Sequence, residues 1–479
     1  MGDNLAANRH SQWSPANFIN EEAIAELLEQ GKVASESTVR AIITAARQAK
    51  GLTMAEVAVL LQVTDKKLLT EMFEVAKEIK LKIYGKRLVL FAPLYVSDYC
   101  INNCAYCGYK RENCFQRRKL TKAQLVEEVR ILESLGHKRL ALEAGEHPTE
   151  CPLDYILESI RTIYSIKFEN GSIRRVNVNI AATTQEDYKR LKSAGIGTYI
   201  LFQETYHRKT YEAMHSSGPK ADYDWHTTAH HRAMQAGIDD VGFGVLLGLY
   251  DYKFEVLAML QHALNLEARF GVGPHTISVP RLRPALGMGL EQFPYLVSDA
   301  DFAKLTAIIR LAVPYTGLIL STREKPVLRE KLLDYGISQI SAGSCTGVGG
   351  YKREESRSME EDDAKAQFSV DDHRSPDEVV RSVCQSGYLP SYCTACYRQG
   401  RTGDRFMALA KNGQIQNVCQ PNALITFKEY LLDYASQETR QIGEETIRRQ
   451  LEEIENEKVR SVTRERLRRV EEGERDLYL

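Results

Sequence analysis

The stretch LVLFAPLYVSDYCINNCAYCGYK, residues 88–110, joins an apolar run to three closely spaced cysteines. Cys100, Cys104 and Cys107 follow the spacing C-x3-C-x2-C, with no histidine among them and with Tyr106 directly before the last. A structural zinc site takes four protein ligands, whereas a cube of four irons held by three thiolates leaves one iron open. An open iron can bind a small molecule and act on it. The spacing therefore favours an iron–sulfur cluster, with structural zinc or three ordinary thiols as the alternatives.

The composition is that of an ordinary globular chain. Of its 479 residues 43% are hydrophobic and 27% are charged, and the length fits one large α/β domain with extensions. The net charge of −1 gives no general attraction to nucleic acid or to a membrane surface. There is no apolar run of about 18 residues that would span a membrane, and no apolar segment typical of an export signal. Ten cysteines in such a chain predict a reducing, cytoplasmic compartment and metal binding rather than disulfides.

The apolar run at 88–95 is the first of eight. Short apolar runs alternate with helical patterns between residues 86 and 350, which predicts parallel strands joined by helical crossovers. Eight such units predict a closed (β/α)8 barrel, the TIM barrel. An open doubly wound sheet is the alternative, but no Gly-x-Gly-x-x-Gly motif follows the first run. The later runs are 139–143, 176–181, 199–203, 241–247, 276–279, 318–321 and 339–342.

The two flanks of the predicted barrel have other patterns. Residues 1–85 are predicted to form an N-terminal helical extension, because apolar residues at helical spacing follow a capping box of Thr53 and Glu56. Residues 351–479 are predicted to form a mostly helical C-terminal domain. Its first part, 351–375, is dense in charge and predicts an exposed connection. From about residue 424 the pattern predicts a solvated helical tail with i,i+4 ion pairs.

Polar side chains gather where the predicted strands end, which is where barrel enzymes place their reactive groups. After the second strand, Glu146 could bind an amino group, and Gly145 would allow the backbone to approach closely. A loop carboxylate that faces solvent is the alternative for Glu146. After the seventh strand, Arg323 could clamp a carboxylate by two hydrogen bonds. Further candidates at strand ends are Asn177, Asn179, Gln203, Glu204, Thr205, Ser321 and Ser341.

A second cysteine set, C-x2-C-x22-C, lies in the C-terminal region. Cys393, Cys396 and Cys419 would need a fourth ligand for zinc, which Cys384 or His373 could supply. A second iron–sulfur cluster with an open iron is the sharper hypothesis. Nearby arginines would offset the cluster's negative charge, or would simply lie at the surface: Arg398, Arg401 and Arg405.

Together these motifs resemble the HydG family of [FeFe]-hydrogenase maturases, which are radical S-adenosylmethionine (SAM) tyrosine lyases. The resemblance rests on C-x3-C-x2-C, on EAGE at 143–146 and on the C-terminal C-x2-C-x22-C, and it covers essentially the whole chain. It implies two [4Fe-4S] clusters. At the first, SAM yields a 5′-deoxyadenosyl radical that attacks the amino group of L-tyrosine, giving p-cresol and dehydroglycine. At the second, dehydroglycine becomes CO and cyanide on an additional iron bridged by free cysteine, and an Fe(CO)(CN) unit results.

The resemblance also implies roles for single residues. Cys100, Cys104 and Cys107 would hold the SAM cluster, and Cys393, Cys396 and Cys419 the second one. The extra iron would be bound by His275, which from spacing alone would more often be structural. The residues that position SAM would be Tyr106, Glu146, Asn179, Glu204 and Arg232. The tyrosine carboxylate would meet Ser321, Arg323 and Ser341.

The resemblance further implies partners and an environment: Fe(II), an electron donor and the other hydrogenase maturases, in an anaerobic cell. Two alternatives stay open. One is the thiamine-pathway tyrosine lyase, which makes the same first cleavage but lacks the C-terminal cysteine triplet. The other is a zinc-stabilised scaffold without catalysis.

Overall fold

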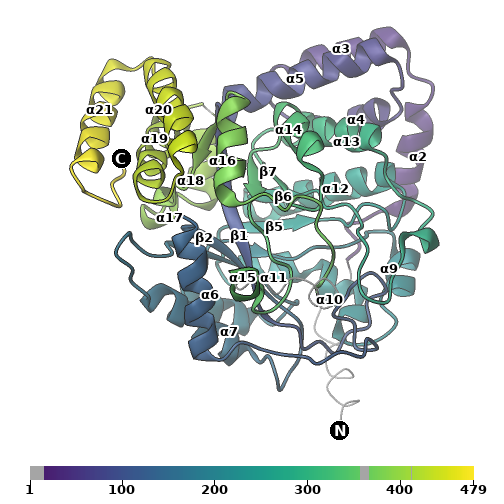
Figure 1. Ribbon diagram of the computed structural model, residues 1–479. Coiled ribbons are helices and arrows are strands. Elements are labelled where there is room, and N and C mark those ends of the chain that lie inside the picture. Colours follow the sequence, from purple (N-terminus) through teal and green to yellow (C-terminus); the bar gives the residue numbers. More distant parts are fainter. Residues whose placement is uncertain (1–15, 356–365, 412) are drawn as a thin grey trace.

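A computed structural model describes residues 16–355, 366–411 and 413–479 of the chain (Figure 1). Eight parallel strands close into a barrel, because β1 pairs with β2 on one side and with β8 on the other. This confirms the predicted (β/α)8 fold. The barrel strands are β1 (Arg87–Ser97), β2 (Arg139–Ala144), β3 (Arg175–Asn179), β4 (Tyr199–Ile200), β5 (Val241–Gly244), β6 (Thr276–Ser278), β7 (Gly317–Leu320) and β8 (Gln339–Ser341).

Helices surround these strands and begin where the sequence supplies caps. The predicted capping box of Thr53 and Glu56 forms at the start of α4 (Met54–Leu61), and a second one, of Thr121 and Gln124, forms at the start of α6. The helices between the strands are α6 (Lys122–Ser134), α7 (Leu153–Ser165), α8 (Gln185–Ser193), α9 (Arg208–Met214), η1 (Pro219–Ala221), α10 (Tyr223–Thr227), α11 (Ala229–Gln235), α12 (Tyr252–Phe270), η2 (Leu290–Gln292), α13 (Asp299–Ala312) and α14 (Pro326–Asp334).

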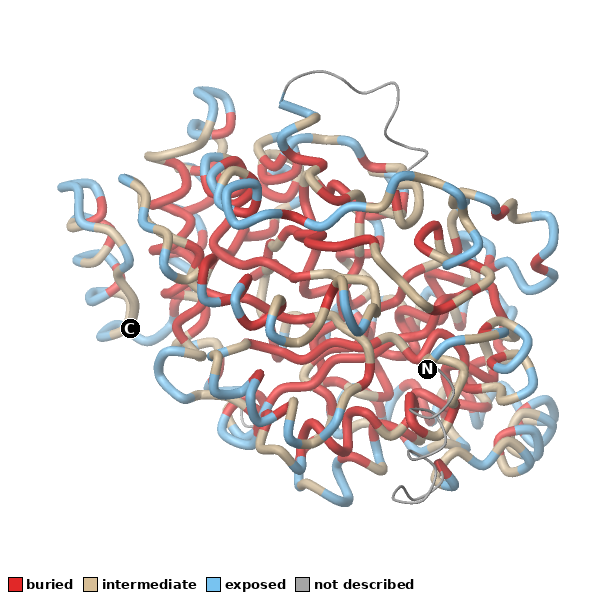
Figure 2. Tube along the Cα trace, turned by 90° about the horizontal axis from the view of Figure 1, so that it is seen from below, coloured by how far each residue is buried: buried red, intermediate tan, exposed pale blue. Residues whose placement is uncertain are grey.

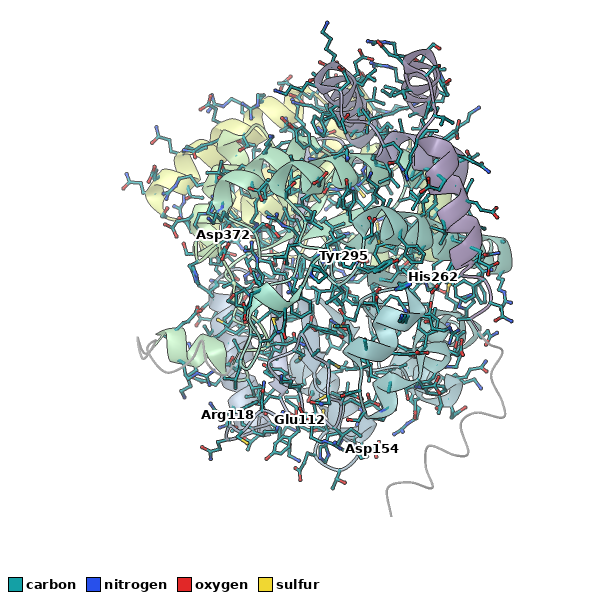
Figure 3. The ribbon with its side chains drawn as sticks, turned by 90° about the vertical axis from the view of Figure 1, so that its right-hand side faces the viewer. Glu112, Arg118, Asp154, His262, Tyr295 and Asp372 are labelled. Atoms are coloured by element: carbon teal, nitrogen blue, oxygen red, sulfur yellow. The ribbon has the colours of Figure 1, made fainter. Side chains whose placement is uncertain are left out.

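The N-terminal segment is helical, as predicted, and packs on the flank of the barrel. Its helices contact α12 and α13 through apolar faces, and Figure 3 shows His262 of α12 on the side that these helices cover. Buried residues concentrate in the barrel, and exposed residues lie on the outer helices (Figure 2). The N-terminal helices are α2 (Glu21–Gly31), α3 (Glu36–Ala46), α4 (Met54–Leu61) and α5 (Lys66–Tyr84).

The C-terminal region attaches to the barrel through a ninth strand. β1 is eleven residues long, and its first residues extend past β8 to pair in parallel with β9. The prediction of a solvated tail from about residue 424 is wrong for α19, whose residues 423–431 are buried. It holds for the exposed face of α21, where Arg468 pairs with Glu472 at i,i+4 and with Glu465 at i,i+3. In Figure 1 the helices α17 to α21 form a group to the left of β1. The C-terminal elements are α15 (Gly350–Glu355), α16 (Pro376–Gln385), β9 (Leu389–Ser391), α17 (Ala395–Arg398), α18 (Gly403–Lys411), α19 (Gln416–Asp433), α20 (Gln437–Glu452) and α21 (Glu457–Glu471).

The charge-rich segment 351–375 differs from the prediction of an exposed connection. Residues 356–365 lie outside the described part of the chain, but those after them pack against the barrel. Gly108 N–H donates to the carbonyl of Gln367 at 2.9 Å, and Asp372 is buried beneath the guanidinium groups of Arg329 and Arg374. The charges of this segment are therefore partly neutralised inside the fold, which composition alone does not reveal.

Candidate functional site

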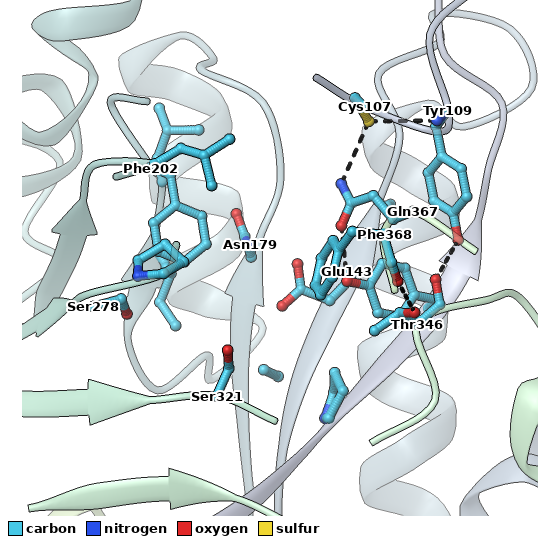
Figure 4. Close-up of a pocket in the computed structure, with 18 of the residues that line it drawn as sticks. Cys107, Tyr109, Glu143, Asn179, Phe202, Ser278, Ser321, Thr346, Gln367 and Phe368 are labelled. Atoms are coloured by element: carbon cyan, nitrogen blue, oxygen red, sulfur yellow. Dashed lines mark hydrogen bonds between the residues drawn. The ribbon is translucent and has the colours of Figure 1, made fainter. Parts of the chain in front are cut away.

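A cavity of about 210 Å³ opens at the C-terminal ends of the barrel strands. Cys100, Cys104 and Cys107 all line it, and Figure 4 shows Cys107 above the inward-facing residues of the strands. Within the described residues, no three histidine, cysteine or carboxylate side chains are grouped to hold one metal ion. A cluster makes a different demand, because each thiolate binds a separate iron and the three must stand around a space. Three cysteines spread around a cavity fit that demand.

Hydrogen bonds fix the cysteine loop. The sulfur of Cys107 accepts from Tyr109 N–H at 3.4 Å and from the side-chain amide of Gln367 at 3.8 Å (Figure 4). Burial raises the pKa of the Cys107 thiol to about 11 and raises that of Cys104 well above its ordinary value. Such thiols become thiolates when a positive partner offsets the burial, and iron supplies that charge. The donor set and its surroundings therefore fit an iron–sulfur cluster.

Asn102 ties the cysteine loop to the next strand end. Its amide donates to Glu146 Oε2 at 2.7 Å, and its Oδ1 accepts from Lys220 N–H at 2.9 Å. A side chain at Gly145 would collide with the carbonyl of Tyr99, so the predicted close backbone approach is observed. Glu146 consequently lines the cavity beside the cluster loop, rather than facing solvent.

Most of the side chains predicted at strand ends line this cavity, and so does Tyr106 of the cysteine loop. The strand-end residues that line it are Glu146, Asn179, Glu204, Ser321, Arg323 and Ser341, whereas Asn177, Gln203 and Thr205 do not. Glu204 has a left-handed backbone conformation, φ 69°, and forms an ion pair of 2.8 Å with Lys220. Arg232 does not line the cavity. Its guanidinium lies against the Trp225 ring and donates hydrogen bonds to the carbonyls of Thr183 and Trp225, outside the cavity.

One part of the cavity combines a carboxyl group, a guanidinium group and an aromatic ring. The Arg323 guanidinium lies 3.3 Å from the centre of the Phe368 ring, and burial lowers its pKa to about 10. Burial likewise raises the pKa of Glu143 to about 8, although a hydrogen bond from Asn179 opposes the shift. Figure 4 shows the Glu143 carboxyl group directed into the cavity. These groups suit a ligand that carries both an amino and a carboxylate group.

The sequence does not single out several of the lining residues, among them Glu143, Lys220, Gln367 and Phe368. For Glu143 the sequence contains a signal, because side chains alternate along a strand and Glu143 therefore lies on the same face as Arg139 and Ala141. For Gln367 and Phe368 it contains none, since they lie in a segment whose composition predicts exposure.

A second, smaller cavity of about 70 Å³ lies at the opposite end of the barrel. Cys393, Cys396, Cys419 and His275 line it together, so the structure brings the histidine to the second cysteine set. The strand starts contribute further lining residues: Arg87, Arg139, Arg175 and Asp240. Arg139 lies four residues before Glu143 on β2, which separates the two cavities by about 13 Å along the strand.

The surroundings of the second cysteine set differ from the prediction in detail. Neither Cys384 nor His373 lines the cavity, so neither stands as the fourth zinc ligand considered from the sequence. Cys384 is buried between α16 and α20, where its thiol meets Thr446. Of the three predicted arginines only Arg401 lines the cavity; Arg398 pairs with Asp476, and Arg405 is exposed.

Comparisons with known proteins agree with this architecture. The Radical SAM superfamily matches residues 94–263, and the Biotin and Thiamin Synthesis associated domain matches residues 278–389. The 2-iminoacetate synthase of Escherichia coli is 29% identical over 72% of this chain and 88% of its own length.

No helix of the described chain is both long and apolar enough to cross a membrane.

Two solved structures are similar over almost the full length. A HydG maturase of the [FeFe]-hydrogenase shares 62% of its residues and has a TM-score of 0.94, over 97% of this chain and all of that one. HydG from Carboxydothermus hydrogenoformans is 38% identical, with a TM-score of 0.80, over 94% of this chain and 99% of its own. A radical SAM domain carries a [4Fe-4S] cluster and binds SAM, and the cysteines of the larger cavity fit that cluster. The chain belongs to the radical SAM superfamily and, within it, to the HydG family of [FeFe]-hydrogenase maturases.

Proposed function

We propose that this protein cleaves L-tyrosine to p-cresol and dehydroglycine and converts dehydroglycine to CO and cyanide, building an Fe(CO)(CN) unit for hydrogenase assembly. One observation carries the proposal: a single barrel has a cavity with three cysteines at each end, and the larger cavity also holds Glu143, Arg323 and two serines at the strand ends. The similarity to a 2-iminoacetate synthase supports the cleavage of tyrosine, and the similarity to HydG structures supports a role in hydrogenase maturation.

In the larger cavity, the bound cluster and SAM would supply a 5′-deoxyadenosyl radical. Glu146, which accepts a hydrogen bond from Asn102 of the cysteine loop, would bind the amino group of SAM. Arg323, with Ser321 and Ser341, would bind the tyrosine carboxylate. Apolar walls exclude water, which protects a reactive carbon radical until it meets the substrate. The remaining candidates for SAM contact are Tyr106, Asn179 and Glu204.

In the smaller cavity, Cys393, Cys396 and Cys419 would hold a second [4Fe-4S] cluster. His275 would bind an additional iron that free cysteine bridges to this cluster. Burial lowers the pKa of His275 to about 4, so its imidazole is neutral and able to bind metal at neutral pH. Arg87, Arg139 and Arg175 surround the site with positive charge, which stabilises a cluster that gathers anionic ligands.

The test is an anaerobic reaction of the reconstituted protein with tyrosine, SAM and a reductant. We expect p-cresol, CO and cyanide, with about eight irons and matching sulfide per chain for two cubes. Release of glyoxylate and p-cresol without CO would instead indicate a thiamine-pathway tyrosine lyase. Zinc without a brown chromophore would indicate a non-catalytic scaffold.

A further inference from the structure

Asp240 is a buried carboxylate at the meeting point of the barrel and the C-terminal region. It directly precedes β5 and is 2% exposed. It lines the smaller cavity together with His275 and the three cysteines. A carboxylate buried beside proposed metal ligands requires hydrogen-bond donors, because an unpaired buried charge is costly.

Two hydrogen-bond donors and the imidazole of His275, all from distant parts of the chain, meet at Asp240. Tyr397 O–H donates to Oδ2 at 2.6 Å, and Gly403 N–H donates to Oδ1 at 3.0 Å. His275 Nδ1 lies 3.4 Å from the same Oδ1. Tyr397 directly follows Cys396 in the sequence, and Gly403 begins α18. One side chain of the barrel therefore contacts both the histidine and the loop that carries the second cysteine set.

The orientation of His275 follows from this contact. Within the described residues, Nδ1 has no hydrogen-bond partner that meets normal geometry, and Asp240 is the carboxylate beside it. A carboxylate next to one ring nitrogen keeps the proton on that nitrogen, which leaves the lone pair of the other free to bind a metal. The Phe406 ring packs against the imidazole, with ring centres 5.0 Å apart, and restricts its rotation.

Further contacts hold the loop that carries Cys396, Tyr397 and Gly403. The Arg175 guanidinium lies over the Tyr397 ring at 3.2 Å, and the Tyr397 hydroxyl also contacts Thr198 Oγ1 at 3.1 Å. Gly403 has φ 53°, a conformation that favours glycine, and this lets its N–H reach Asp240. The distance between Cys396 and His275 is thus set by contacts that share Asp240.

We infer that Asp240 is a positioning residue for iron at the second site: it fixes the proton of His275 on Nδ1, so that Nε2 is the metal-binding nitrogen, and through Tyr397 it sets the spacing between His275 and the cysteine loop. This inference rests on the proposed function, because it needs the additional iron at His275. It assigns to Asp240 no contact with iron, substrate or product.

The test measures iron binding rather than product. The reconstituted protein, with both clusters built from natural iron, is titrated with isotopically labelled Fe(II) and free cysteine. Retained label is counted after gel filtration, and its Mössbauer spectrum is recorded. Asp240→Asn keeps the side-chain volume and one acceptor oxygen but removes the charge. Asp239→Asn makes the same change of charge one residue earlier, on an exposed side chain that contacts Thr402.

We expect Asp240→Asn to raise the Fe(II) concentration at half-saturation by about 10–100-fold, the usual effect of losing such a partner. Asp239→Asn should bind iron like the parent protein. In a His275→Asn background, Asp240→Asn should have no further effect, because its influence passes through the imidazole. Thermal unfolding and the SAM-perturbed EPR signal of the first cluster check that each variant is folded.

Two results would overturn the inference while leaving the proposed function intact. One is parent-like iron binding by Asp240→Asn. The other is a full additional loss from Asp240→Asn in the His275→Asn background, which would make Asp240 a purely structural residue. If the parent protein itself retains no labelled iron with a distinct spectrum, the proposed function fails at its second step and the inference fails with it.

Discussion

Arg139 and Glu143 lie four residues apart on the same face of β2, and they line different cavities. Glu143 belongs to the end with groups for an amino acid, and Arg139 belongs to the end with the second cysteine set and several other arginines. Burial lowers the pKa of Arg139 to about 10, so it remains cationic at neutral pH. β2 therefore presents a carboxyl group to the larger cavity and a positive charge to the smaller one, so the two ends of the barrel suit different chemistry.

Cysteine substitutions at the two ends should separate the two steps. Cys104→Ser removes a thiolate from the larger cavity and should abolish both p-cresol and 5′-deoxyadenosine. Cys396→Ser changes only the smaller cavity and should retain p-cresol while losing CO. Chromatography of the aromatic product and a haem-binding assay for CO measure the two outcomes. Retained CO with loss of tyrosine cleavage would contradict the assignment.

Arg323→Lys tests the carboxylate site. Lysine keeps the charge but loses the planar fork that binds a carboxylate with two hydrogen bonds. Loss of such charge-assisted bonds should raise the KM for tyrosine by about 10–100-fold. Steady-state p-cresol formation measures this change. Tyramine, which has no carboxylate, is the matched control: if the variant loses as much affinity for tyramine as for tyrosine, Arg323 does not bind the carboxylate.

Gly108→Ala should disturb the larger cavity through the backbone. A side chain there would collide with the carbonyl of Ala366, and it would push the segment that carries Gln367 away from Cys107. We expect a loss of about 1–3 kcal/mol in stability, as for other overpacked sites, together with slower formation of 5′-deoxyadenosine. Gly273→Ala is the control, because its added carbon would meet only an ordinary contact, Ala263 O at 3.6 Å. Equal effects of the two variants would contradict the prediction.

Buried histidines should make the fold sensitive to acid. Burial lowers the pKa of His215 and of His230 to about 3, whereas histidine in an unfolded chain titrates near 6.5. Between these values the unfolded chain binds protons that the folded chain does not, so the free energy of unfolding falls as the pH drops below about 6.5. Each histidine contributes about 1.4 kcal/mol per pH unit in that window. Anaerobic urea unfolding at several pH values measures the slope, and His230→Gln should reduce it; an unchanged slope would contradict the assignment.

The alternation of apolar runs with helical patterns and the spacing of the cysteines are local properties of the sequence. They were enough to predict the barrel and both cysteine sets. The eight apolar runs became the eight strands, because a segment that fits a buried strand carries that information in its own side chains. The pattern predicts that polar side chains at the strand ends share one rim. Glu146, Asn179 and Ser321 do line one cavity, whereas Asn177, Gln203 and Thr205 do not. That expectation needed only the rule that parallel strands present the same ends together.

Other features depended on contacts between distant segments. Nothing near His275 in the sequence points to Cys393 or Asp240, and Arg232 has the same residue type as Arg323 but donates to backbone carbonyls outside the cavity. Gln367 reaches Cys107 across 260 residues because Gly108 leaves room for it.

The sequence by itself therefore determined which chemical groups the protein carries and at which strand ends they lie. Only the tertiary structure decided which of them share a cavity, because strand register, β9 pairing and the contacts of segment 366–372 with the barrel arise from long-range packing.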